Sequence, residues 1–419
     1  MIRARSLLCA VGVAGSIASA FLSGGCSRST SAIAENPVWL RHPSGALAVV
    51  QRRAVTDPNR VIGEDYERGK PEIDPKNRRV FVGSSDRGLY ALRADDMTTI
   101  WRYQAAGVVQ SEPLYDGTTD VVYFGSNDGA LYRVRASDGS LLWRFSTNAE
   151  VSRRPVLQGG RLFVSNANDT VFALDPEKGT LLWQHHRTPA GGIEIASHAG
   201  PAVVDGRVFI SFSDGRVSSF SAESGRELWN VDLAAEAEQV SGEIPRQLDA
   251  DATPVVARVE NTTHVYVASY AGGVHSLDAE TGSRNWSNDK VTGIVDLTLY
   301  EEPAHTGETG SPVPARRMLI ATGSSGIWAL SLEDGRELWR RSLPEGGATP
   351  PVPLAGALLV ATSRYGLFLL SPIHGAVIDG IETGSGFAAT PAAFGRRAYA
   401  FTNQGILLGI HVNAPMKRR

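Results

Sequence analysis

The chain has 419 residues, a formal net charge of −3, 42% hydrophobic residues and two cysteines. A charge so close to zero indicates no nucleic-acid partner, and the length exceeds what one ordinary core holds. With 44 glycines, 22 prolines and few long helix-forming stretches, the composition indicates an all-β protein.

The N-terminus reads as an export signal. MIRAR carries two arginines, an apolar run of 17 residues follows, and SGGC comes next. A basic start, a short apolar run and small residues before a cleavage point are typical of a secretory signal rather than of a membrane-spanning helix. We therefore expect residues 1–25 to be removed. Cys26 resembles the lipidated first residue of bacterial lipoproteins, and an ordinary secreted protein with an incidental cysteine is the alternative.

The cysteines limit the chemistry of the mature chain. Cys9 lies in the predicted leader, so one cysteine remains and neither an internal disulfide nor a cysteine-based zinc site can form. Acyl chains on Cys26 would tether residues 26–38, a linker, to a membrane surface. Ser27 follows the cysteine, and a residue other than aspartate at that position resembles the sorting signal of lipoproteins that reach the outer membrane. After residue 38, no segment is long and apolar enough to span a membrane.

A repeat dominates the remainder of the chain. Seven windows of 11 residues, such as RVRASDGSLLW (133–143) and SFSAESGRELW (219–229), share glycine at the seventh position in six cases. The last position is tryptophan in six windows: Trp101, Trp143, Trp183, Trp229, Trp286 and Trp339. Self-similarity at this period indicates a repeat architecture.

Each repeat predicts four short strands. Alternating strands and polar turns precede each window, and further upstream lies a short strand opened by proline, as in SEPLYDG and RRPVLQG. A lone four-stranded meander cannot cover its own faces, but radial stacking buries both of them in a β-propeller. The tryptophans are then rings packed between blades. A nucleic-acid stacking platform is the alternative, and it lacks a basic stripe.

The ends of the chain predict how the ring closes. An eighth unit begins at residue 389, but the chain stops before its fourth strand. A strand-like run over 46–53 stands alone ahead of the first unit, and pairing it with the last blade would cover an open edge. The prediction is an all-β, eight-bladed propeller over 39–419 of four-stranded antiparallel blades, closed by an N-terminal strand.

These repeats resemble the PQQ-type propeller repeat, A-x-D-x-x-x-G-x-x-x-W. Its carriers include quinoprotein dehydrogenases, sensor or scaffold domains, and the BamB family of outer-membrane assembly lipoproteins. The dehydrogenases also resemble eight-bladed propellers, but they are considerably longer than this chain. Their added length supplies an axial cofactor pocket, a calcium site and paired cysteines. This chain has no Cys-Cys pair and no insertion able to roof such a pocket. We expect no cofactor.

No catalytic or metal motif is present in the sequence. H-E-x-x-H, G-x-S-x-G and the phosphate-binding loop are all missing, and His185 and His186 alternate faces of one strand. His305 lies in a Gly/Pro-rich insertion, residues 301–317, which we expect to be a surface loop. The dipeptides Asp128-Gly129 and Asp214-Gly215 predict hairpin turns. We expect no catalytic residue and no metal ion.

The BamB resemblance accounts for the signal, the anchor and the eight blades. It implies a non-enzymatic scaffold at the outer membrane, facing the periplasm, that docks on the barrel-insertion protein BamA and its nascent clients. In the family, two loops contact that partner. The second matches EIPRQLDADATPVV here, with Arg246, Asp249 and Asp251. The first is GGIEIASHAGP, where Ile193 and Ile195 replace two leucines and Ala196 replaces an arginine, which removes a charge-assisted hydrogen bond.

Each contact residue has alternatives. Ile193 and Ile195 are either apolar anchors for a partner or one edge of a half-buried strand. Asp249 and Asp251 either bind basic groups of a partner, cap their own loop, or hold calcium, for which the further oxygen ligands are missing. Arg246 either pairs with these carboxylates or bridges to the partner. A propeller that serves a different partner as sensor or scaffold remains the main alternative function.

Overall fold

The computed structural model describes residues 44–56, 66–189, 198–233, 250–270, 272–306, 312–324, 326–343, 346–364 and 366–413. The predicted leader, the linker and four candidate contact residues lie outside this part of the chain, together with Cys26; the four are Ile193, Ile195, Arg246 and Asp249. Asp251 and the six repeat tryptophans lie within it.

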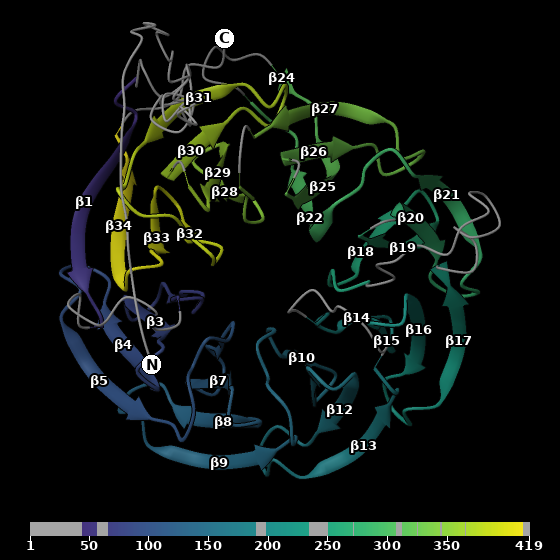
Figure 1. Cartoon of the computed structure of the whole chain (residues 1–419), viewed down its shortest axis with the longest axis horizontal. Helices are drawn as coiled ribbons and strands as arrows, with labels where there is room; N and C mark the ends of the chain where they lie inside the picture. Colours follow the sequence, from purple (N-terminus) through teal and green to yellow (C-terminus); the bar gives the residue numbers. More distant parts are fainter. Residues whose placement is uncertain are drawn as a thin grey trace, which may run out of the picture. The chain divides into compact units, whose positions relative to one another are not determined.

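The described residues form eight four-stranded antiparallel sheets arranged in a ring (Figure 1). Numbered in chain order, blades 1 to 4 comprise β2 (Glu72–Asp74), β3 (Arg79–Gly83), β4 (Gly88–Arg93) and β5 (Thr99–Gln104); β6 (Leu114–Asp116), β7 (Val121–Ser126), β8 (Ala130–Arg135) and β9 (Leu141–Ser146); β10 (Val156–Gln158), β11 (Arg161–Asn166), β12 (Thr170–Leu174) and β13 (Leu181–His186); β14 (Ala202–Val204), β15 (Arg207–Ser211), β16 (Arg216–Ser221) and β17 (Glu227–Asp232).

Blades 5 to 8 continue the ring in the same strand order, with the N-terminal strand joining the last blade. They comprise β18 (Val255–Val259), β19 (Thr262–Ser269), β20 (Gly273–Asp278) and β21 (Arg284–Asn288); β22 (Ile294–Glu302), β25 (Arg316–Gly323), β26 (Gly326–Leu330) and β27 (Glu337–Ser342); β28 (Val352–Leu354), β29 (Ala357–Thr362), β30 (Gly366–Leu370) and β31 (Val377–Ile381); β32 (Ala392–Phe394), β33 (Arg397–Phe401), β34 (Ile406–Val412) and β1 (Leu47–Ala54).

The eight-bladed propeller and its closure by an N-terminal strand are confirmed. Strand β1 pairs antiparallel with β34, from Leu47 opposite Val412 to Ala54 opposite Ile406. It is the outermost strand of blade 8, and its bounds differ by one residue at each end from the predicted run 46–53.

Burial follows strand position within each blade. The second and third strands are buried on both faces, as in RVFVG of β3 and TVFAL of β12, while the outermost strands alternate with exposed residues. The buried apolar residues form eight clusters in the described chain, and each cluster joins two adjacent blades. The cores therefore lie between blades, which is why no blade could be stable alone.

The insertion at 301–317 differs from the expected surface loop. Strand pairing between β22 and β25 continues through Glu301 opposite Arg317 and Glu302 opposite Arg316. Both cross-strand pairs are ion pairs, at 2.7 and 3.3 Å between nitrogen and oxygen. Beyond them, β23 (His305–Thr306) pairs with β24 (Pro312–Val313). The ends of the segment are thus a hairpin extension of blade 6, because opposite charges across the two strands support continued pairing.

Six tryptophans dock blades 1 to 6 each on the blade that follows. Each indole Nε1 donates a hydrogen bond of 2.9 to 3.1 Å to a main-chain carbonyl of the following blade: Trp101 to Ala136, Trp143 to Pro176, Trp183 to Ala222, Trp229 to Ala279, Trp286 to Leu332 and Trp339 to Pro372. The ring lies against the repeat glycine of that blade, where φ is between 62° and 75° and an added Cβ would come within 2.4 to 2.9 Å of the indole.

The two interfaces of blade 8 depart from this pattern. At the first, Asp379 replaces the tryptophan of blade 7, is 2% exposed, and accepts hydrogen bonds from the amides of Ser44 (2.8 Å) and Leu47 (2.7 Å). A buried carboxylate that accepts main-chain N–H groups makes strong, charge-assisted bonds. Asp379 thus anchors the start of the closing strand.

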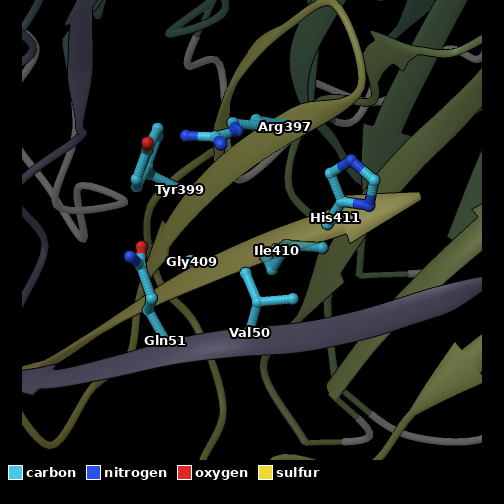
Figure 2. Close-up of a pocket in the computed structure, with 7 residues that line it drawn as sticks. All are labelled: Val50, Gln51, Arg397, Tyr399, Gly409, Ile410 and His411. Carbon is cyan, nitrogen blue, oxygen red and sulfur yellow. The ribbon is translucent and has the colours of Figure 1, made fainter. Parts of the chain in front are cut away.

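At the second interface, Gln51 on β1 occupies the tryptophan position opposite Gly409, and Met97 replaces the repeat glycine. The Gln51 amide donates to the carbonyl of Asp95, and the Tyr399 hydroxyl donates to that of Ala94 at 2.6 Å. Gln51 and Tyr399 line a pocket of about 260 Å³. Figure 2 shows Gln51 on β1, Tyr399 and Arg397 on β33, and His411 on β34 around this pocket.

The tight glycine contact predicts a stability effect that depends on position. Replacing Gly335 by alanine should lower the free energy of unfolding by about 2–4 kcal/mol, because its Cβ would meet the Trp286 ring and its φ is +70°. Gly206 is the matched control, with φ +73° and no atom within 4 Å of an added Cβ. Gly206→Ala should cost only about 1 kcal/mol. Urea unfolding monitored by tryptophan fluorescence measures both, and equal losses would contradict the docking role of Gly335.

Candidate functional site

The innermost strands of the blades surround the axis of the ring (Figure 1), and ionisable residues from six blades lie in these strands or just before them. Five residues just precede innermost strands of blades 1 to 5, and one lies within that of blade 6: Lys70, Glu112, Arg153, His198, Asp251 and Asp296. We call these six residues the axial cluster. In blades 1 to 5 a proline follows within one to three positions, and it opens the strand because it supplies no N–H to an innermost edge.

Arg153 is the centre of the axial cluster. Its Nη1 lies 3.2 Å from Asp296 Oδ1 and 3.6 Å from Glu112 Oε1. Its Nε donates to the carbonyl of His198 at 2.6 Å, and its Nη2 donates to the carbonyl of Asp251 at 3.4 Å. One guanidinium of blade 3 therefore contacts blades 2, 4, 5 and 6.

Two further ion pairs flank this centre. Lys70 Nζ lies 3.0 Å from the second carboxylate oxygen of Glu112, which connects blade 1 to blade 2. Arg154 donates two hydrogen bonds of 2.7 Å to Glu72, and a third to the carbonyl of Pro113 at 2.9 Å. The first of these pairs extends the axial cluster, whereas the hydrogen bonds of Arg154 go, within the described residues, to blades 1 and 2.

The electrostatics of the cluster follow from burial and pairing. Burial raises the pKa of Glu112, but the charges of Lys70 and Arg153 outweigh burial and bring the pKa below its ordinary value. Burial dominates at Asp296, whose pKa is raised although Arg153 opposes the shift. Burial opposes ionisation of Arg153, yet Asp296 and Glu112 raise its pKa above the ordinary value. The guanidinium is therefore the fixed positive charge of the site.

His198 is the neutral member of the cluster. Its side chain is 5% exposed, and burial, followed by the charge of Arg153, lowers its pKa to about 3. Its Nδ1 lies 3.4 Å from the hydroxyl of Ser152. An imidazole that stays neutral throughout the physiological range cannot act as a proton shuttle there.

A pocket of about 410 Å³ lies beside the cluster and is walled by β2, β28 and β32. Its lining is mainly proline, alanine and other apolar residues, including Phe394, which is 60% exposed. The cations that reach it, Lys70 and Arg154, are already paired with Glu112 and Glu72. The pocket therefore presents an apolar wall beside neutralised charges.

The pocket of Figure 2 is lined by residues of blade 8 alone, and its position in the repeat recurs elsewhere. An equivalent hollow between blades 4 and 5 has Arg207 and Phe209 where blade 8 has Arg397 and Tyr399. Both pairs are the first and third residues of the second strand of their blade. The same two positions of the repeat thus border a hollow in both places.

The structure brings one predicted contact residue to the axis. Asp251 is half-buried in the axial cluster, where its carbonyl contacts Arg153 and its charge contributes to the raised pKa of that arginine. Whether Asp251 meets Arg246, Asp249 or the isoleucines falls outside the described residues. No sequence motif singled out Arg153, Glu112 and Lys70, although charged residues stand before the prolines in GKPEI, SEPLY and RRPVL. Their mutual pairing requires the ring.

The axial cluster is built from ion pairs and from hydrogen bonds to main-chain carbonyls. In the described ranges, no group of three or more His, Cys, Asp or Glu side chains is placed to hold a metal ion. Over the same ranges, no helix has the length and apolar character needed to cross a membrane. The chemistry that the cluster does support is the fixing of main-chain segments by charge-assisted hydrogen bonds.

Comparison with known proteins shows the family. The sequence model described as "Outer membrane protein assembly factor BamB" matches residues 116–309 and 300–378. The protein of that name from Legionella pneumophila is 24% identical over 225 residues, which cover 54% of this chain and 53% of the relative. The chain thus spans about half the length of that curated relative.

Two other likenesses bear on fold and on activity. The crystal structure of BamB from Moraxella catarrhalis superposes with a TM-score of 0.67 at 19% identity, over 87% of this chain and 99% of that one. A 1-butanol dehydrogenase (cytochrome c) from Thauera butanivorans is 26% identical over 225 residues, which cover 51% of this chain and 30% of the relative. The repeat is therefore similar in both classes of protein.

The buried neutral His198 predicts a pH effect on stability. In the unfolded chain, His198 binds a proton as the pH falls below the ordinary histidine pKa of about 6.5. In the folded chain it binds that proton only near its lowered pKa of about 3. This histidine therefore stabilises the fold less as pH falls, by up to about 1.4 kcal/mol per pH unit between pH 6 and 4. His198→Gln should flatten the dependence of the unfolding free energy on pH in that range. Urea titrations at pH 7.5, 6, 5 and 4 measure it, and identical slopes would contradict the assignment.

Proposed function

Because the chain belongs to the BamB family of outer membrane protein assembly factors, we propose that it is a non-enzymatic scaffold of the machinery that assembles outer-membrane β-barrels. The observation that carries this proposal is the family match over residues 116–378, in a chain whose repeats build a complete eight-bladed ring. We place the protein at the outer membrane, facing the periplasm, with the barrel-insertion protein as its partner and nascent barrel proteins as its clients.

The partner surface in this proposal is formed by the two loops before β14 and β18. The apolar pair Ile193 and Ile195 supplies anchors, and Arg246, Asp249 and Asp251 supply charges. Interfaces of this kind depend on a few central residues that are flanked by polar groups. The half-buried position of Asp251 beside Arg153 supports a surface that extends toward the axis of the ring.

The anchor in this proposal is Cys26, with residues 1–25 removed, 26–38 as a linker and 39–419 as the propeller. Its expected consequence is that Cys26→Ser moves the protein from the membrane fraction to the soluble periplasmic fraction. Acyl chains supply the hydrophobic binding energy for the membrane, and a serine cannot be given the thioether-linked lipid. Fractionation and the mass of the mature N-terminal peptide measure this, and an unmodified Cys26 in the wild type would refute the anchor.

An envelope pull-down tests the partner. The wild type, solubilised in detergent, should recover the barrel-insertion protein, while Ile195→Asp and Asp249→Arg should each reduce recovery at least tenfold, a loss of about 1.4 kcal/mol. The matched controls are Ile100→Asp on the exposed side of β5 and Glu223→Arg in the turn before β17, which should leave recovery unchanged. Circular dichroism verifies folding of all four variants. Failure of the folded wild type to recover this partner would overturn the assignment.

A dehydrogenase function is the second candidate because of the likeness to 1-butanol dehydrogenase. Its relative is much longer, since the match covers only 30% of it. Titration of the purified protein with pyrroloquinoline quinone and calcium, followed by absorbance, separates the two functions. Stoichiometric binding would favour the dehydrogenase, and the scaffold predicts no spectral change.

A further inference from the structure

Arg153 contacts the chain immediately after both proposed partner loops. Its Nε donates to the carbonyl of His198, the first described residue after 190–197. Its Nη2 donates to the carbonyl of Asp251, two positions after Asp249. A single planar group therefore bridges the main chain at the C-terminal ends of two segments that are about 50 residues apart in sequence.

The guanidinium is itself held in place from other blades. Its remaining nitrogen, Nη1, lies between Asp296 of blade 6 and Glu112 of blade 2, and Glu112 is paired in turn with Lys70. The main chain before it is fixed too, because the carbonyl of Ser152 accepts the amide of Glu112 at 2.9 Å. With its side chain only 15% exposed, Arg153 has little freedom to leave this position.

The following inference rests on the proposed function and concerns the partner surface formed by the loops before β14 and β18. We propose that Arg153 is a positioning residue that sets the spacing between the chain at His198 and the chain at Asp251, so that both loops meet the partner together. A surface that is ordered before binding loses less conformational entropy on association. The acidic pair Asp296 and Glu112 serves to aim the guanidinium at the two carbonyls.

A purely structural role for Arg153 makes a different prediction. If the residue only neutralises Asp296 and Glu112, a lysine should replace it, since the positive charge is kept. If it positions the two loops, a lysine should fail, because one ammonium lacks the planar fork that serves both carbonyls and both carboxylates at once.

The test compares Arg153→Lys with Arg154→Lys in the full chain, with the barrel-insertion protein in detergent as the probe. Arg154 is the matched control, since its partners are Glu72 and the carbonyl of Pro113, neither of which adjoins a proposed loop. R153K should weaken binding about tenfold and R154K by less than twofold, with melting temperatures of both near that of the wild type. Adding Asp249→Arg to R153K should cost less than it costs alone, because both changes disable one surface.

Hydrogen exchange without the partner separates failure of this inference from failure of the proposed function. Amides in peptides covering 198–204 and 250–257, which contain His198 and Asp251, should exchange faster in R153K than in the wild type. Their exchange should be unchanged in R154K. If the wild type binds no barrel-insertion protein, the proposed function fails, and exchange alone then decides the role of Arg153. Wild-type exchange, or wild-type affinity, in folded R153K would overturn the positioning role.

A second variant covers the case in which R153K does not fold. Asp296→Asn keeps the arginine and removes only the carboxylate that aims Nη1. It should speed exchange in the same two peptides and weaken binding by less than R153K does. Unchanged exchange in folded Asp296→Asn would contradict the proposed aiming of the guanidinium.

Discussion

The contact between a tryptophan ring and a bare glycine turn is the constraint on which this ring depends. The indole of one blade lies on the turn of the next and donates a hydrogen bond to its main chain, six times around the structure. The glycine is required twice, for its positive φ and for the space that a Cβ would occupy. Each contact fixes how one blade sits on the next, and so the eight inter-blade cores can all be buried at once.

Closure of the ring imposes a different requirement, because the two ends of the chain must meet in one blade. In the described part of the chain, no turn with the repeat glycine joins β34 to β1, and the closing strand begins at that position. Asp379 compensates by accepting the amides of Ser44 and Leu47, where a tryptophan would have no turn to rest on. At the other side, Gln51 donates a main-chain hydrogen bond in the place of the indole. Polar anchors thus replace the aromatic one at both interfaces of the closing blade.

The axial cluster is a consequence of the arrangement of blades 1 to 6 around one axis. Taking charges out of water is costly unless each meets an opposite charge or a carbonyl, and the ring supplies both to Arg153 from four different blades. This network fixes the main chain at His198 and Asp251 to the other blades. Its members come from chain positions between 70 and 296, so the network exists only in the assembled ring.

The sequence by itself determined the repeat, the strand content, the number of blades and the N-terminal closure. These follow from local regularities, namely strand alternation, turn residues and the recurring glycine and tryptophan, which act within one unit or between neighbours. It also identified the carboxylates around Asp251 as a candidate contact region. Only the tertiary structure decided that Asp251 lies beside Arg153, that Asp379 anchors Ser44 across more than 300 residues, and that residues 301–302 and 316–317 are paired strands. Pairings of that range depend on how the ring closes, and no local pattern encodes which charges will meet across its axis.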